Sequence, residues 1–264
     1  MKALTHDIRM VFLDIDGTLA HHGKLVDSAV ESVQELIRNG IPVALCTGRS
    51  RLHATGVLDA LGVSMAVFFN GGLVEMDQRI LYANPLSEAT VTKMIDFFER
   101  EEIPLILHTR TNAVTLQPLP NSLNSVLDAF AFPNIVQVSR NEWNITESAT
   151  YQANMFCTRD WDPTIQNILP ECLLYRWEED GADLQQRNCD KAEGAKFLLK
   201  ELGISPEHAL HIGDGGNDVG LFKLLGMSVA MGNAHSEVKR HAKMTTSTVT
   251  EHGVQRALTR LGLI

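Results

Sequence analysis

The chain has 264 residues, of which 44% are hydrophobic and 21% charged, so it can build a sizeable core and is not a disordered chain. Its formal net charge of −9 argues against general nucleic-acid binding, which depends on cationic surfaces. No segment approaches the ~20 apolar residues of a membrane span, and the first residues lack the pattern of a signal peptide. We therefore expect a cytoplasmic protein whose partner is neither a nucleic acid nor a membrane.

Residues 1–82 alternate strand and helix signals. Apolar runs at 8–13, 41–46 and 63–69 are typical of strands that are buried on both faces of a sheet. Helical spacing of apolar residues follows the first two runs, at 27–39 and 50–61, with Asp27 expected as the N-cap of the first helix. This order predicts a parallel sheet with helices on both faces.

The middle of the chain changes to α+β character. A hairpin is predicted at 73–82, with its turn at Asp77-Gln78. Helices are then expected at 87–102 and 122–131, and strands at 105–109, 113–117, 149–157 and 172–179, the last two on either side of 161–169. The α/β order returns with helices at 191–202, 218–225 and 250–261 and strands at 208–212 and 227–231. We predict a doubly wound, Rossmann-like α/β core (1–82 and 187–264) with a smaller α+β domain inserted at 83–186.

The first candidate motif is D-I-D-G-T, in which Asp14 and Asp16 follow the first strand. Side chains at i and i+2 point the same way in an extended chain, so both carboxylates can face one site. Neighbouring carboxylates repel each other unless a cation or a proton lies between them, and oxygen ligands suit Mg²⁺. A calcium loop would need Gly and Glu where this chain has Leu19 and Leu25, so that interpretation fails. The ordinary alternative is a strand end with two surface aspartates.

Three further motifs lie at strand ends or helix starts. In Thr47-Gly48-Arg49, a hydroxyl and backbone N–H groups at a helix start can hold a phosphoryl oxygen. Lys191 begins a predicted helix, where the macrodipole disfavours a cation, and this indicates an anionic partner. The segment GDGGND at 213–218 permits a tight turn, and Asp214 can be a third oxygen ligand. Alone, each has an ordinary interpretation as a helix N-terminus, a solvated lysine or a capped turn.

Together, and in this order, the four motifs resemble those of the haloacid dehalogenase-like (HAD) phosphatases. The fit is closest to the Cof-type branch, which has a large cap domain between the second and third motifs and a tail similar to GDGGNDVGLFKLLGMSVAMGNA here. The resemblance is specific at 9–72 and 188–257 and weak in the cap. It implies a Mg²⁺-dependent phosphatase that hydrolyses a small phosphomonoester, such as a sugar phosphate. We expect a monomer or homodimer.

The resemblance also implies roles for single residues. Asp14 would be the nucleophile that forms an aspartyl phosphate, and Asp16 would protonate the leaving oxygen and then activate water. Asp14, the backbone carbonyl of Asp16, and Asp214 would hold Mg²⁺. Asn70 and Gly71 resemble the N-G loop of the family.

The remaining implied roles concern the phosphoryl group. Its oxygens would be bound by Thr47, the backbone N–H of Gly48, and Lys191. Asn217 would also touch the phosphate. Asp218 would orient Lys191 or metal-bound water without contacting the substrate.

Two other functions stay open. One is a phosphotransferase or mutase of the same superfamily, although a mutase usually carries its cap directly after the first motif, where this chain has only a short loop. The other is a catalytically silent regulator that binds a small molecule, although such proteins usually lose a nucleophile, acid or metal ligand. His21 and His22 in that short loop are more simply solvated than metal-bound.

The cap is expected to select the leaving group. Polar or aromatic candidates for this task are His108, Arg110, Asn154, Arg159, Tyr175, Trp177 and Arg187. For each of them, an ordinary place on the cap surface or in its core is the favoured interpretation.

Overall fold

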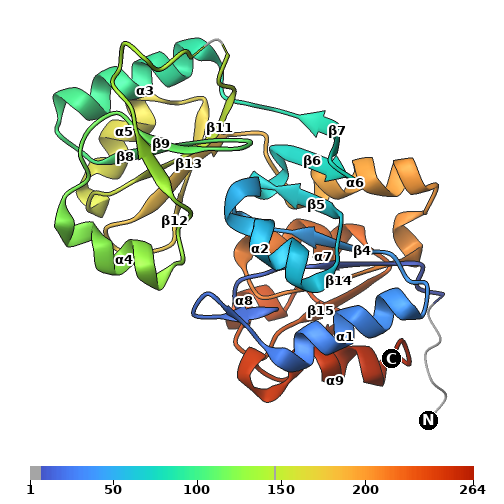
Figure 1. Cartoon of the computed structure of the whole chain (residues 1–264). Coiled ribbons are helices and arrows are strands. Elements are labelled where there is room, and N and C mark those ends of the chain that lie inside the picture. Colours follow the sequence, from blue (N-terminus) through green and yellow to red (C-terminus); the bar gives the residue numbers. More distant parts are fainter. Residues whose placement is uncertain (1–6, 146) are drawn as a thin grey trace. The chain divides into compact units, whose positions relative to one another are not determined.

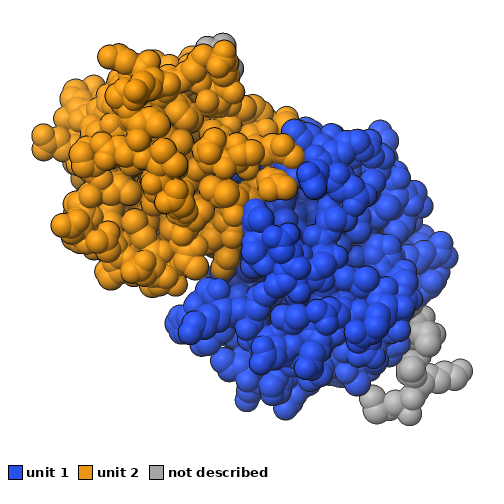
Figure 2. Space-filling view, viewed as in Figure 1, with its two compact units in different colours: residues 1–48, 55–82, 190–264 blue, residues 49–54, 83–189 orange. Residues whose placement is uncertain are grey.

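The computed structural model describes residues 7–145 and 147–264. The chain divides into two compact units (Figure 2). The first contains the described residues up to 48 together with 55–82 and 190–264, and the second contains residues 49–54 and 83–189. None of the helices in the described part of the chain is both long and apolar enough to cross a bilayer.

The first unit is built on an eight-stranded sheet of order β16-β15-β14-β1-β4-β5-β6-β7 (Figure 1). The strands are β1 (Met10–Leu13), β4 (Val43–Cys46), β5 (Met65–Phe68), β6 (Leu73–Met76), β7 (Arg79–Ala83), β14 (Ala209–Gly213), β15 (Met227–Ala230) and β16 (Met244–Thr245). All pairs from β16 to β5 are parallel, and β6 runs antiparallel to β5. The chain leaves the central β1 toward β4 on one side and returns later as β14 on the other. Such a switch point is where open α/β sheets bind ligands, and the predicted doubly wound α/β fold is confirmed.

Helices cover this sheet and close its core. They are α1 (Asp27–Arg38), α2 (Arg51–Leu61), α6 (Lys191–Leu202), α7 (Val219–Leu224), α8 (Ser236–Lys239) and α9 (Gly253–Arg260). Met10 and Phe12 of β1 are fully buried and pack with Ala195 and Leu198 of α6 and with Leu221 of α7. The short β2 (Ala20–His21) and β3 (Lys24–Leu25) form a separate hairpin after β1.

Asp27 is not the N-cap of α1, contrary to the sequence-based expectation. The cap position belongs to Val26, which has an extended backbone and makes no side-chain cap bond. The amide of Val26 donates to the carbonyl of Leu19, so the chain is already fixed as it enters the helix. Asp27 instead lies in the first turn, where its charge complements the helix dipole.

The predicted hairpin at 73–82 is present as β6 and β7. Its two turn residues, Asp77 and Gln78, have φ of 50° and 65°. A two-residue turn of type I′ needs positive φ at both positions, and Asp is one of the residues that tolerate it. The turn follows the right-handed twist of the two strands.

The second unit has a six-stranded mixed sheet of order β10-β9-β8-β11-β13-β12 (Figure 1). The strands are β8 (Leu105–Thr109), β9 (Ala113–Thr115), β10 (Ile135–Gln137), β11 (Thr150–Met155), β12 (Cys172–Arg176) and β13 (Ala182–Gln186). Its helices are α3 (Glu88–Arg100), α4 (Asn124–Ala129) and α5 (Asp162–Ile168). The Oγ of Ser87 caps α3 by accepting from the amide of Thr90 at 3.1 Å.

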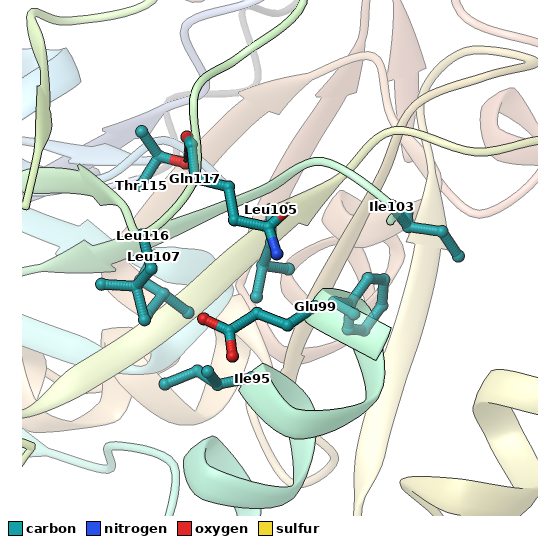
Figure 3. Close-up of a pocket in the computed structure, with 9 residues that line it drawn as sticks. Ile95, Glu99, Ile103, Leu105, Leu107, Thr115, Leu116 and Gln117 are labelled. Atoms are coloured by element: carbon teal, nitrogen blue, oxygen red, sulfur yellow. Dashed lines mark hydrogen bonds between the residues drawn. The ribbon is translucent and has the colours of Figure 1, made fainter. Parts of the chain in front are cut away.

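Two apolar clusters pack helices of the second unit against this sheet. Residues of α3 and α5 pack with Leu107, Ala153 and Leu184 in one cluster, whereas Ile106 lies in another with Val126 of α4. The first cluster borders a cavity of about 20 Å³ between α3 and β8, with Glu99 at its edge (Figure 3). That volume holds about one water molecule, so the cavity is too small for a metabolite.

Candidate active site

The nucleophile candidate Asp14 directly follows the central strand of the first unit. Its amide donates to the carbonyl of Ile212 at 3.0 Å, which ties it to β14, and its side chain is buried. Asp16 is exposed, and Gly17 after it has φ of 73°. The oxygens of Asp14, Asp214 and Asp218 lie within 4.8 Å of one another; among the described residues, Asp16 is not part of that group. The carboxylate of Asp16 is thus outside the group formed by Asp14, Asp214 and Asp218.

Lys191 connects two of these carboxylates. It is the first residue of α6 and is 1% exposed, so its interpretation as a solvated lysine is wrong. Its Nζ lies 2.7 Å from Oδ1 of Asp14 and 2.8 Å from Oδ1 of Asp218. Burial alone would lower the pKa of Lys191, but the two carboxylates outweigh burial and raise it. Lys191 is therefore held as a cation beside the carboxylate of Asp14.

Asp218 organises the G-D-G-G-N-D loop. Its Oδ1 accepts from Lys191 and from Nε2 of His211, and its Oδ2 accepts from the amides of Asp214 and Gly215 at 3.0 and 2.9 Å. Burial would raise the pKa of Asp218, but Lys191 and His211 lower it well below its ordinary value. Glycine is required at Gly213, because a Cβ there would lie 2.4 Å from Oδ2 of Asp218.

Asp214 is held by a residue that the sequence-based assignment did not include. The side-chain Nδ2 of Asn233 donates to Oδ2 of Asp214 and to the carbonyl of Gly17, both at 2.9 Å. Its own Oδ1 accepts from the amide of Val249 at 2.9 Å. Asn233 lies in the M-G-N-A stretch of the tail that resembles the Cof-type branch, so the motif itself was the available signal.

Thr47, Gly48 and Asn217 adjoin the predicted N-G loop. Asn70 has φ of 51°, donates its amide to the carbonyl of Thr47 at 3.0 Å, and accepts at Oδ1 from Asn217 at 2.9 Å. A Cβ at Gly48 would lie 3.2 Å from the side chain of Asn70. Gly71 has φ of 105° and passes so close to the backbone of Asp190 that a Cβ would not fit. The second motif and the fourth are thus joined through Asn70.

The donor set fits a hard divalent cation. Asp14 and Asp214 present carboxylate oxygens only, which suits Mg²⁺. Burial, followed by the neighbouring carboxylates Asp218, Asp214 and Asp16, raises the pKa of Asp14 well above its usual value, although Lys191 opposes this. Burial and the charge of Asp218 likewise raise the pKa of Asp214 to about 6. A cation among these oxygens would reverse both shifts, because it favours the charged carboxylates.

Several cap candidates make hydrogen bonds or ion pairs within the second unit. His108 and Asn154 are buried, are bonded to each other, and belong to a network around Asp183. Nε1 of Trp177 donates to Oδ1 of Asp183 at 2.8 Å. Arg159 pairs with Glu179, Arg187 donates to the carbonyls of Pro170 and Cys172, and Tyr175 is 38% exposed.

The two loop histidines are also ordinary residues. The rings of His21 and His22 lie 4.1 Å apart in the exposed β2–β3 hairpin. Within the described residues, neither belongs to the group of potential metal ligands.

Comparison with known proteins agrees with this geometry. The profile of the haloacid dehalogenase-like hydrolases matches residues 11–258, so the chain belongs to that family. A hypothetical protein of Geobacillus kaustophilus HTA426 is 31% identical with a TM-score of 0.88, covering 97% of this chain and 100% of its own. The subclass IIB sugar phosphatase BT4131 is 25% identical with a TM-score of 0.84 and the same coverage.

Within the family, the chain falls in the Cof-type subclass IIB, which resembles sugar phosphatases and carries a cap domain. YkrA of Bacillus subtilis (strain 168), whose name describes a phosphatase, is 29% identical over 260 residues, which are 98% of this chain and 99% of that protein. The chain is a HAD-type phosphatase.

Proposed function

We propose that the protein is a Mg²⁺-dependent phosphatase that hydrolyses a small sugar phosphate or similar phosphomonoester through an aspartyl phosphate on Asp14. The observation that carries the proposal is the position of Lys191, whose Nζ lies 2.7 Å from Asp14. A buried cation beside a buried carboxylate that is also grouped with Asp214 is suited to stabilise phosphoryl oxygens next to a nucleophile.

In the first step, an oxygen of Asp14 attacks phosphorus while the bond to the leaving oxygen breaks. Asp16, which is exposed to solvent, gives its proton to that oxygen, so the product leaves as an alcohol. In the second step, Asp16 takes a proton from water as the water attacks phosphorus. The bond between phosphorus and Asp14 then breaks, which releases inorganic phosphate and restores the nucleophile.

Mg²⁺ would be held by Asp14, Asp214 and the backbone carbonyl of Asp16, and it would supply positive charge that neutralises the phosphoryl oxygens. We assign Asp218 a different role, because its two oxygens already accept four hydrogen bonds. A carboxylate has about four lone-pair positions, so Asp218 has none left for a metal. It holds Lys191 and the loop in place.

The remaining phosphoryl contacts in the proposal are the hydroxyl of Thr47, the amide of Gly48, and Asn217. Thr47 is 1% exposed, and Asn217 is fixed by its bond to Asn70. Groups held in this way need little reorganisation as charge develops on the phosphoryl oxygens. The choice of a sugar phosphate is supported by the similarity to the sugar phosphatase BT4131.

The test is phosphate release from p-nitrophenyl phosphate, from a panel of sugar phosphates and from pyridoxal phosphate, with Mg²⁺ and with a chelator. We expect Mg²⁺-dependent release, with highest kcat/KM for a sugar phosphate. Release that is independent of metal would refute the metal assignment. No release from any ester would favour a phosphotransferase or a silent binding protein.

A further inference from the structure

His211 is a buried histidine that none of the catalytic steps uses. It lies on β14, its side chain is 0% exposed, and its ring packs 5.5 Å from that of Phe222. Nδ1 lies 3.1 Å from the carbonyl oxygen of Phe12, which belongs to the neighbouring strand β1. Nε2 lies 2.9 Å from Oδ1 of Asp218. Because the carboxylate is ionised and can only accept, Nε2 carries a proton and donates it to Asp218.

The bond from His211 completes a chain that ends at the nucleophile. His211 donates to Asp218, Lys191 donates to the same oxygen, and the same Nζ donates to Asp14. Asp218 therefore has two donors on Oδ1, and the backbone loop 214–215 fixes only its other oxygen. Without His211, one side of Oδ1 would be buried and unpaired, and the carboxylate could turn away from its present orientation.

A turn of Asp218 would move Lys191. The side chain of Lys191 is 1% exposed, so its ammonium group must follow its two carboxylate partners within the buried site. A second effect is electrostatic, because His211 shares the negative charge of Asp218 with Lys191. When that donor is lost, Asp218 attracts Lys191 more strongly, and less of the lysine charge acts on the oxygens at Asp14.

We infer that His211 is a positioning residue of the phosphatase site: through Asp218 it fixes Lys191 against Asp14. This inference rests on the proposed function, in which Lys191 stabilises the transferred phosphoryl group. The simpler role of His211 is that of a packed core residue, which would affect stability and leave turnover unchanged. The two roles predict different kinetics.

Two polar substitutions separate the two contacts of the ring. In His211→Asn, the shorter amide matches the place of Nδ1 and stays near the carbonyl of Phe12, but it cannot reach Asp218. In His211→Gln, the longer amide extends to the place of Nε2 and keeps a donor for Asp218. Ser228→Ala is the matched control, because Ser228 is the register partner of His211 on β15, is fully buried, and bonds the amide of Lys243 away from the site.

The experiment measures kcat and KM with p-nitrophenyl phosphate and Mg²⁺, and urea unfolding, for the wild type and these three variants. We expect His211→Asn to lose about 10- to 100-fold in kcat with little change in KM, the size of effect that follows from misplacing a catalytic group by about 1 Å. His211→Gln should restore kcat to within about threefold because its donor is retained. Ser228→Ala should be less stable than the wild type and have normal kcat.

A His211→Asn variant that turns over at the wild-type rate would overturn the inference, and so would a His211→Gln variant as slow as His211→Asn. If His211→Asn does not fold, the His211→Gln result decides alone. An inactive wild type refutes the proposed function, and crystal structures then decide the positioning role. The inference is supported if Lys191 moves away from Asp14 in His211→Asn and keeps its place in His211→Gln. It is overturned if Lys191 keeps its place in both variants.

Discussion

Gly17→Ala would disturb the metal site through a single methyl group. Gly17 has φ of 73°, and a Cβ there would lie 2.0 Å from Oδ2 of Asp214. Ordinary contact begins near 3.4 Å, so the two groups must separate by about 1.4 Å (3.4 − 2.0). Asp214 cannot retreat freely, because Asn233 holds the same oxygen and also bonds the carbonyl of Gly17.

The expected cost has two parts. Placing alanine in the left-handed region costs about 1–2 kcal/mol of stability. The displacement of Asp214 should lower Mg²⁺-dependent kcat/KM by about 100-fold or more, since misplacing a catalytic group by about 1 Å has that effect. Part of the lost activity should be recovered at high Mg²⁺ concentration, because the metal site binds more weakly but keeps its other ligands.

Gly40→Ala is the matched control for this substitution. Gly40 has φ of 75° and no atom within 4 Å of its Cβ position, so alanine there brings the same backbone strain without a contact. Both variants should lose similar stability in urea unfolding, while only Gly17→Ala loses activity in a Mg²⁺ titration of phosphate release. Wild-type activity in Gly17→Ala, or an equal loss of activity in Gly40→Ala, would refute the reasoning.

Three further predictions concern single carboxylates. Asp14→Asn should abolish turnover while thermal unfolding stays cooperative, and substantial activity in that variant would remove the covalent mechanism. Asp16→Asn should slow release of the sugar in the first turnover far more than release of p-nitrophenol, whose leaving oxygen needs no proton, although steady-state turnover of both esters falls because the variant also lacks the base of the second step; equal losses in the first turnover would contradict an acid role. Burial raises the pKa of Asp183 to about 7 from 3.8 despite its bonds to Trp177 and Asn154, so the folded state holds a proton that the unfolded chain releases. Stability of the second unit should therefore fall as pH rises from about 4 to 7, by up to about 4 kcal/mol, and urea midpoints that rise over this range would contradict it.

Sequence patterns predicted the elements that obey simple rules. The helix at 191–202 and the strand at 105–109 have the predicted bounds. The strand Ala182–Gln186 was missed, because Asp183 and Gln185 look like surface residues although both are buried. Nε2 of Gln152 donates to Asp183 at 2.7 Å, a pairing across strands that no local pattern shows. The same network explains why His108 and Asn154 are interior residues of the cap.

The four sequence motifs predicted most of the residues that lie at the site. They did not predict His211 and Asn233, which hold those residues in place. His211 reads as one polar residue within an apolar strand, and the turn that follows β14 brings Asp218 back to its ring. Asn233 lies 19 residues from Asp214 in the chain and meets it through the fold. Such supporting contacts depend on tertiary structure, so spacing alone does not reveal them.

Trapping the phosphoryl group on Asp14 tests the covalent mechanism directly. The enzyme is mixed with radiolabelled phosphomonoester and Mg²⁺, quenched in acid within the first turnover, and digested for mass spectrometry. We expect label on the peptide that contains Asp14, and none in Asp14→Asn or when Mg²⁺ is chelated. Rapid phosphate release without label on that peptide, or label on another residue, would contradict it.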